Sequence, residues 1–512
     1  MFDVIESIIG PITVTRILST LLIILLLYYL WPVFNNPISH VPGPFVYPIV
    51  GSFLGYFKNG LGPNDIILKK KYGKIFRVHE GRQPSVVIGD VKKLRQVLVK
   101  NFSTFVDRRD LIFRDIIKYS LIDATGETWR RQRHLLTPSF TTGKLKKMQS
   151  YIQKCVDRFC ENIDKLAKSG EEFEAKTYAG MFTMDVIAST GFGMELDSQA
   201  DPNNPFVTNA RKVFDISISD PAFMIALFTP FLIPLFEWFG YSSLPKKNIN
   251  FFRRMMEPMI KERKENPNTH VDMLQLMIDS QHDAMDEEAK KDLKEQGNTG
   301  VGESHIKKGL TDNELIAQAL VFFLAGYDTT ANTLSFMLYE LSRNQDVQDK
   351  LYEEVSLHME GKKMTYENVW KIEYLDQCIM ETLRLYPPLQ RIDRMCNQDI
   401  EIDGLFIPRR TLVIIPAYML QRDPEIWEDP EKFDPSRFSP EAKAARDQFY
   451  HLPFGMGPRQ CIGMRLALLE MKMLMVSLIQ RFRLLPSQKP LELDYSFLVR
   501  TKSGAWLKAA RR

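Results

Sequence analysis

Residues 453–463 read PFGMGPRQCIG, a stretch in which one cysteine, Cys461, is surrounded by three glycines and two prolines. A free cysteine that only fills space in a core is normally packed among side chains. Glycine has no side chain and lets the backbone approach another group closely. The residues that follow, CIGMRLALLEMKMLMVSLIQ, have a helical period with an apolar face that includes Leu466 and Met473. The sequence therefore predicts a thiol at the start of a helix, in a loop suited to close contact.

The position of Cys461 indicates a chemical role for its sulfur. The unpaired N–H groups and the dipole at a helix N-terminus stabilise negative charge, which favours the thiolate over the thiol. A thiolate there can bind a metal or an electrophile. A tetrahedral zinc site is not expected, because it needs clustered Cys and His ligands and the eight histidines of the chain provide none beside Cys461.

The spacing of five residues is more specific than the cysteine alone. Phe454, Gly457, Arg459, Cys461 and Gly463 match the haem-ligand signature FxxGxRxCxG, and in these residues the chain resembles the cytochrome P-450 family. The resemblance implies haem b (iron protoporphyrin IX) as cofactor, with Cys461 as the axial metal ligand. It also implies that Phe454 lies at the haem and that Arg459 pairs with a haem propionate.

A second motif lies 80 residues before the cysteine, in ETLRLYPP at residues 381–388. Glu381 and Arg384 are three apart, on one helical face, and the two prolines that follow end the helix. The pair resembles the family's ExxR motif, with Arg437 of FDPSRF as the third member of a buried charge network. Ser436 stands where the family commonly has a glutamate.

Two more segments resemble parts of the family that hold the haem propionates. WRRQR supplies Trp129 and Arg133, which match the family's WxxxR. Arg394, in RIDRMC, is a further propionate ligand by position. On charge alone the WRRQR segment reads as an amphipathic basic helix.

Residues 314–343 have the pattern of one helix, about 45 Å long at about 1.5 Å per residue. Its middle, AGYDTT, places polar residues among apolar ones. From the residues alone, this can be a packing glycine and a threonine bonded to its own helix. The resemblance implies an oxygen-binding groove at Ala325 and Gly326, where Gly326 leaves room for dioxygen, and a catalytic acid and alcohol pair in Asp328 and Thr329.

The N-terminal part has a different composition. Residues 17–34, ILSTLLIILLLYYLWPVF, are uncharged and long enough to span a bilayer. A cleaved signal peptide is the alternative, but the apolar stretch is too long and acidic residues precede it. We expect a membrane anchor at residues 1–34, a proline-rich hinge at residues 35–44 and one haem-binding catalytic domain at residues 45–512. Anchor orientation does not follow from charge, because no Lys or Arg lies between Arg16 and Lys58.

Composition restricts the remaining possibilities. Lys plus Arg number 67 against 63 Asp plus Glu, so the charge of +4 gives no indication of a nucleic-acid partner. Five scattered cysteines without a CxxC pair indicate a reducing compartment. Helical patterns dominate, with strands expected at residues 85–90, 401–408 and 411–418. The fold class is therefore mainly α with a minor β-sheet.

Two segments are interpreted from composition alone. Residues 221–240 are apolar but contain Pro230, Pro234 and Glu237, so they form either buried core or short helices that dip into the membrane surface. Residues 281–309 are polar and are expected to be an exposed connection.

The stretches at residues 136–148, 184–193, 271–281 and 373–388 are most similar to the animal microsomal family 3 group. The similarity implies a monooxygenase that oxidises lipophilic steroid-like or xenobiotic-like substrates, using NADPH electrons through a flavoprotein reductase. Cytochrome b5 is a further candidate partner. It also implies a single-pass anchor in the endoplasmic reticulum membrane, with the catalytic domain cytosolic.

Two other functions are compatible with this fold. One is a thromboxane-synthase-like endoperoxide isomerase, and the other is a non-catalytic membrane haem sensor. Asp328 and Thr329 favour monooxygenation, because only that chemistry needs proton delivery to reduced dioxygen.

Two surfaces of the expected domain are assigned by position. Candidate substrate contacts come from Arg108–Ser120, Phe223–Phe231, Phe322–Phe323, Leu389–Ile392 and Phe497–Leu498. A basic cluster that can steer an acidic flavoprotein, or can simply be a solvated face, comprises Arg130, Arg131, Lys144, Lys146 and Lys147.

Overall fold

The computed structural model describes residues 11–109, 116–201, 203–214, 224, 227–229, 232, 235, 238, 245–266, 272–279 and 309–512. Helices make up most of this part of the chain, and the predicted mainly α fold is confirmed. The main helices of the globular body are α6 (Gly126–Leu136), α7 (Thr142–Ser169), α8 (Ala175–Phe192), α9 (Pro205–Phe214), α12 (Lys246–Glu265), α13 (Met273–Asp279), α15 (Asp312–Arg343), α16 (Gln345–Met359), α18 (Glu373–Leu385) and α21 (Met464–Arg481).

Further helices complete the helical part of the fold. They are α3 (Leu54–Asn59), α4 (Leu61–Tyr72), α5 (Val91–Arg95), α17 (Tyr366–Trp370), α19 (Ala417–Leu420) and α20 (Pro440–Ala445). The predicted span of α15 is confirmed within two residues, and a capping box between Thr311 and Glu314 begins it.

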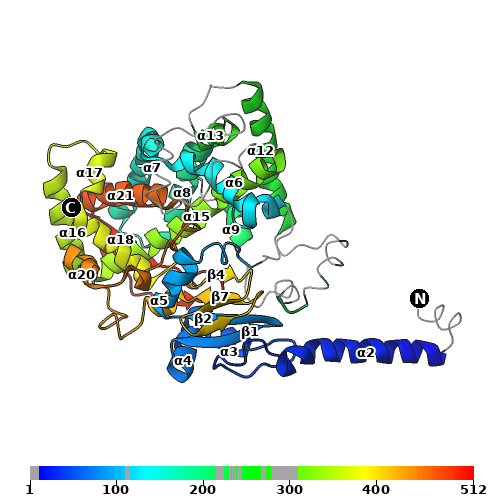
Figure 1. Cartoon of the computed structure of the whole chain (residues 1–512). Helices are drawn as coiled ribbons and strands as arrows, with labels where there is room; N and C mark the ends of the chain where they lie inside the picture. The colour runs from blue at the N-terminus through cyan, green and yellow to red at the C-terminus, as the bar shows by residue number, and fades with distance from the viewer. Residues whose placement is uncertain are drawn as a thin grey trace.

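The largest sheet has the order β1-β2-β7-β4. It is built from β1 (Ile75–Glu80), β2 (Gln83–Ile88), β7 (Leu412–Ile415) and β4 (Ile392–Met395), and only the β2–β7 pair is parallel. This sheet lies on the side of the molecule nearest the N-terminal helix (Figure 1). The strands predicted at residues 85–90 and 411–418 are β2 and β7, so this part of the prediction is confirmed.

Smaller sheets complete the fold. The segment predicted as strand at residues 401–408 is a hairpin of β5 (Ile400–Ile402) and β6 (Leu405–Ile407). The remaining strands are β3 (Phe173–Glu174), β8 (Phe482–Pro486), β11 (Trp506–Arg511), β9 (Leu493–Asp494) and β10 (Arg500–Thr501).

Helix α2 (Pro11–Phe34) contains the predicted apolar helix and extends away from the globular body (Figure 1). Its stretch Thr15–Phe34 has a mean hydropathy of 2.2, and only 11% of that stretch is buried. Among the described residues, it is the one helix long and apolar enough to cross a membrane. Residues 221–240 are described only at 224, 227–229, 232, 235 and 238, so Pro230, Pro234 and Glu237 lie outside the described residues, as does the connection at 281–308.

A buried ion pair within α18 is also hydrogen-bonded to the segment that precedes the cysteine loop. Arg384 Nε and Nη2 donate to the two carboxylate oxygens of Glu381 at 2.7 and 2.8 Å, and neither side chain is exposed. Arg384 also donates to the carbonyl oxygens of Gln421, Pro430 and Lys432. This guanidinium therefore fixes three points of a chain segment that has little secondary structure of its own.

Glu381 is held from two further directions. It accepts a hydrogen bond from the backbone N–H of Asp434 at 2.9 Å, and Arg437 Nε lies 3.5 Å from its Oε1. Ser436, which stands in place of the family's common glutamate, instead donates its hydroxyl to Asp434 at 2.6 Å. The structure brings Glu381, Arg384 and Arg437 together as the sequence predicts.

We expect Arg384→Met to lower the free energy of unfolding by about 3–5 kcal/mol, because Glu381 is then left charged and buried without its main partner. Guanidinium denaturation of the purified chain measures this change. The control is Arg95→Met, whose partner Asp447 is part-exposed, and it should cost less than about 1 kcal/mol. Equal small losses in both variants would show that the buried pair does not stabilise the fold.

Candidate functional site

Cys461 lies in a tight loop just before α21. Its backbone N–H donates to the carbonyl oxygen of Phe454 at 2.8 Å, which closes the loop. The helix begins at Met464 with Gly463 as N-cap, so the thiol precedes the helix by a few residues and does not lie in its first turn. Of the five cysteines, only Cys461 has an exposed side chain.

The loop requires glycine at position 457. Gly457 has a φ of +78°, and a Cβ there would lie 2.1 Å from the carbonyl oxygen of Leu98. A side chain is therefore excluded by both backbone conformation and space. Gly463 differs, because a Cβ there would meet its nearest atom, from Phe140, at an ordinary 3.8 Å.

The predicted preference of Cys461 for the thiolate is not supported by its position alone. Protein atoms enclose the sulfur on most sides although it remains accessible, and this desolvation raises the pKa of the thiol. N–H groups of Gly463 and Met464 and the charges of Arg133 and Arg108 oppose that rise without cancelling it. A metal bound to the sulfur therefore has to supply the remaining stabilisation of the anion.

Four guanidinium groups converge near the cysteine loop: Arg108, Arg133, Arg394 and Arg459. Burial and mutual repulsion lower the pKa of Arg133 to about 10, of Arg394 to about 9 and of Arg459 to about 8. Burial also lowers the pKa of Arg108, against the attraction of nearby acidic groups. The region thus holds more positive charge than its own carboxylates neutralise.

Several donors of this cluster lack a partner within the protein. Nε and Nη2 of Arg133 and Nε of Arg394 are buried without a hydrogen bond. Buried donors normally have acceptors, and guanidinium groups match carboxylates particularly well. The cluster therefore fits a ligand that carries carboxylates, as the two propionates of haem do.

Arg459 differs from the other three arginines because most of its donors are hydrogen-bonded to backbone carbonyl oxygens. Its donors reach the backbone carbonyl oxygens of Val106 (2.9 Å), Leu121 (3.2 Å) and Ala124 (2.6 Å). Its guanidinium also lies 4.4 Å from the centre of the Trp129 ring, which is 1% exposed. Arg459 thus fastens the cysteine loop to the segment before α6, and most of its hydrogen-bonding capacity is used there.

Arg108 is a charged member of the site that the sequence does not indicate. It stands in a stretch considered only for substrate contacts, and no fixed spacing marks it. Its Nη2 donates to the carbonyl oxygen of Arg459 at 3.4 Å, just as Arg133 donates to that of Gln460 at 3.0 Å. Both guanidinium groups therefore support the backbone next to Cys461.

The middle of α15 contains the predicted groove residues. Ala325 is exposed and Thr329 partly exposed, while the flanking residues of this helix are almost all buried. The Thr329 hydroxyl donates to the carbonyl oxygen of Ala325 at 2.7 Å. The helix continues without a break through this point, and Ala325, Gly326 and Thr329 form its open face.

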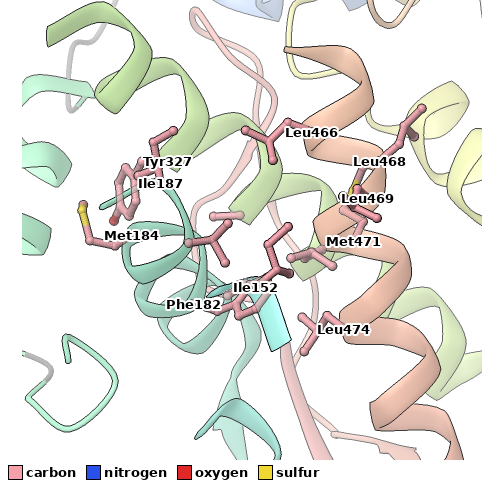
Figure 2. Packing of buried hydrophobic residues seen from close by; sticks show 14 of the residues in the cluster. Ile152, Phe182, Met184, Ile187, Tyr327, Leu466, Leu468, Leu469, Met471 and Leu474 are labelled. Atoms are coloured by element: carbon pink, nitrogen blue, oxygen red, sulfur yellow. The ribbon is translucent and has the colours of Figure 1, made fainter. Parts of the chain in front are cut away.

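Gly326 packs closely against α8, while its predicted role of leaving room for dioxygen stays a prediction. A Cβ at Gly326 would lie 3.1 Å from Cδ1 of Ile187 on α8. The absent side chain therefore lets α8 pack closely against α15, in the core that Figure 2 shows around Ile187 and Tyr327. The sequence indicates that position 326 is unusual, but the contact with Ile187 of α8 is seen only in the structure.

Asp328 is turned away from the groove. Its carboxylate, 2% exposed, lies 3.2 Å from Lys176 of α8 and 3.0 Å from Arg500 of β10. It also accepts a hydrogen bond from Asn332 at 3.1 Å. The structure therefore does not bring the predicted acid and alcohol into contact, since Thr329 bonds to its own helix instead.

The predicted substrate contacts are placed unevenly. Phe323 is fully buried against the rings of Phe192, Phe206 and Phe252, so its prediction as a pocket residue is wrong. Leu389 is 45% exposed and forms a β-bridge with Leu498. Residues 110–115, 223, 225–226 and 230–231 lie outside the described residues.

The basic cluster is partly neutralised. Arg131 donates to Glu314 and to the carbonyl oxygen of Gly309, and Lys146 forms an ion pair with Glu367 at 2.5 Å. Arg130 pairs with Glu127. Within the part of the chain that the structure describes, no salt bridge involves Lys144 or Lys147. The free positive charge is therefore smaller than the sequence predicts and lies at the start of α7.

Comparison with known proteins gives a consistent result. The family model "Cytochrome P450" matches residues 41–508. Cytochrome P450 3A12 of Canis lupus familiaris is 40% identical over 501 residues, which cover 96% of each chain. Cytochrome P450 3A2 of Rattus norvegicus and cytochrome P450 3A5 of Homo sapiens are each 40% identical over 478 residues, 92% of this chain and 91% of theirs.

The two glycines of the cysteine loop should respond differently to the same substitution. Gly457→Ala should abolish most haem retention, because the new methyl group overlaps the Leu98 carbonyl and the backbone conformation disfavours alanine. Gly463→Ala should retain haem at close to the wild-type level. The measurement is the haem-to-protein ratio after purification, and equal ratios in both variants would contradict the geometry of the loop.

Proposed function

The chain belongs to the cytochrome P-450 family, and from this premise we propose how its residues divide the work of the reaction. The chain is a haem-dependent monooxygenase that oxidises lipophilic molecules of the steroid or xenobiotic kind with electrons that a reductase takes from NADPH. The predicted haem cofactor and enzyme class are thus confirmed. The isomerase and haem-sensor alternatives are not favoured.

The observation that carries the proposal is the pairing of one accessible cysteine with a buried, under-neutralised arginine cluster. Cys461 would hold the haem iron through its sulfur, and the carbonyl oxygen of Phe454 closes its loop by accepting from the N–H of the cysteine. When bound, a thiolate-ligated haem supplies the activation of molecular oxygen for insertion into a C–H bond.

The arginines bind and orient the cofactor. The unpaired donors of Arg133 and Arg394 receive the propionates, and Arg108 adds positive charge beside them. Trp129 and Arg459 stack on one another and keep the cysteine loop in register with the segment before α6. These contacts neutralise charge that otherwise remains buried at a cost in free energy.

Residues of α15 handle protons on the open side of the site. The Thr329 hydroxyl holds a proton beside Ala325 and passes it into the groove. Asp328 resupplies that proton after its carboxylate leaves Lys176 and Arg500 and takes up a proton from water. The acid and the alcohol therefore act in sequence through a rearrangement.

Helix α2 and its surroundings support a membrane location for the enzyme. We infer that α2 spans the endoplasmic reticulum membrane once and leaves the catalytic domain cytosolic. Near its C-terminal end, large apolar side chains are exposed: Trp31 (57%), Phe34 (82%), Phe45 (62%) and Tyr47 (47%). Aromatic side chains are favoured at membrane–water interfaces, which supports a bilayer against this face.

Electron delivery requires a surface near the cysteine. The start of α7 follows α6, whose Trp129 and Arg133 belong to the haem site, and it presents Lys144 and Lys147. We propose this surface as the docking site of the NADPH-dependent flavoprotein reductase, with cytochrome b5 as a competing partner. Complementary charge makes such docking fast and salt-sensitive.

Thr329→Ala should leave haem binding intact and lower the product formed per NADPH by about one to two orders of magnitude, because electrons are lost to peroxide when proton delivery fails. The control is Thr333→Ala, which removes a hydroxyl that bonds to Thr329 O one turn along α15. Unchanged coupling in Thr329→Ala, or an equal loss in both variants, would refute the role of the groove hydroxyl.

Charge reversal at Lys144 and Lys147 should slow the first electron transfer from reductase by about tenfold at low salt. Turnover driven by an organic peroxide bypasses the reductase and should persist. The control is Lys165→Glu, an exposed lysine near the other end of α7. Loss of both activities in the double variant would mean that these lysines serve folding or haem retention.

A further inference from the structure

The C-terminal part of α2 contacts the catalytic domain through two tyrosines. The Tyr29 side chain is 8% exposed, and its hydroxyl donates to the carbonyl oxygen of Phe228 at 3.3 Å. The guanidinium carbon of Arg82 lies 3.5 Å from the centre of the Tyr28 ring. Arg82 comes from the turn between β1 and β2, so the sheet and the anchor meet at this point.

The turn that carries Arg82 is fixed by close packing. Gly81 has a φ of +61°, and a Cβ there would lie 3.1 Å from the Phe228 ring and 3.4 Å from the carbonyl oxygen of Ile49. The β1–β2 turn therefore packs against the segment before α3 and against Phe228, whose carbonyl oxygen accepts from Tyr29 of α2. Arg82 is held at a defined place beside the anchor.

Arg82 supplies a positive charge that the anchor itself lacks. The last turn of α2 contains no basic residue, and no Lys or Arg lies between Arg16 and Lys58 in the sequence. Membrane helices commonly have Lys or Arg at their cytosolic end, where the side chain reaches the lipid head groups. At this anchor, the fold provides that charge from a distant segment.

The guanidinium of Arg82 has no anionic partner among the described residues. Its Nε is buried without a hydrogen bond, and no salt bridge to it is present in that part of the chain. The nearest acid in sequence, Glu80, is already paired with both Arg109 and Arg391. The terminal nitrogens of Arg82 are therefore available to an acceptor from outside the protein.

The surroundings of Arg82 indicate which acceptor that is. The packed turn lies next to exposed apolar side chains of residues 45–54, including Ile49 (48%) and Leu54 (50%). These side chains and the aromatic residues at the end of α2 define the depth at which the head groups of a bilayer lie. A phosphate group at that depth is within reach of an arginine fixed on Tyr28.

We propose that Arg82, held against Tyr28, binds the phosphate of a lipid whose head group has a net negative charge. Such a head group attracts the guanidinium more strongly than a zwitterionic one does, so the base of the anchor prefers anionic lipids. This inference rests on the proposed membrane insertion of α2. In this proposal, the lipid preference comes from the single guanidinium group of Arg82, whose position is fixed by tertiary packing. Arginine suits this role because its planar group stacks on the ring and still directs donors to a phosphate.

The test uses the full-length holoprotein in lipid nanodiscs that contain spin-labelled phosphatidylserine or phosphatidylcholine. Electron paramagnetic resonance measures the fraction of each lipid that is immobilised by the protein. The wild type should immobilise phosphatidylserine preferentially, and Arg82→Gln should lower that preference by about fivefold. Arg82→Lys should retain part of it, and Arg254→Gln, an exposed change on α12, should retain all of it.

The outcomes separate this inference from the proposed topology. Protease protection of the segment before α2 in sealed vesicles tests whether the helix spans the membrane. If it spans and Arg82→Gln keeps the wild-type lipid preference, the lipid site is refuted while the anchor stands. If Arg254→Gln lowers the preference as much as Arg82→Gln, the effect is general surface charge and the site is also refuted.

Discussion

The structure depends on a group of buried positive charges around the cysteine loop. The carboxylates of the protein do not fully neutralise these charges. Four guanidinium groups, those of Arg108, Arg133, Arg394 and Arg459, lie together in a region where burial lowers their pKa values. They come from segments far apart in sequence, so their convergence is a property of the whole fold. Buried charge without a partner is costly, and an anionic cofactor removes that cost. Folding of this region and binding of haem are therefore coupled.

Buried charge also fixes the segment that leads into the cysteine loop. The Glu381–Arg384 pair fixes the carbonyl groups of the irregular segment that leads to the cysteine loop, and the loop itself tolerates no side chain at position 457. The ion pair thus holds the segment before the loop by charge and hydrogen bonds, and close packing at Gly457 holds the loop itself. Together they leave the sulfur of Cys461 exposed on a rigid loop, which is the arrangement a metal ligand needs.

Local spacing allowed part of the site to be predicted from the sequence. The cysteine loop, the ExxR pair and the long helix α15 depend on residues that are close in sequence, and the structure places them as expected. The roles of Gly326 and Asp328 depend instead on Ile187, Lys176 and Arg500, which belong to other elements. Local periodicity does not predict contacts between residues that are far apart in sequence. The contact of Arg82 with the anchor could not be predicted for the same reason.

The central claim, that Cys461 ligates haem iron as a thiolate, is tested most directly by the absorption spectrum of the reduced protein with carbon monoxide. Thiolate ligation shifts the Soret band of that complex to clearly longer wavelength than a neutral ligand does. The account predicts the long-wavelength band in freshly purified, folded protein and its loss in Cys461→His. A Soret band at the shorter wavelength of neutral ligation in the folded wild type would contradict it.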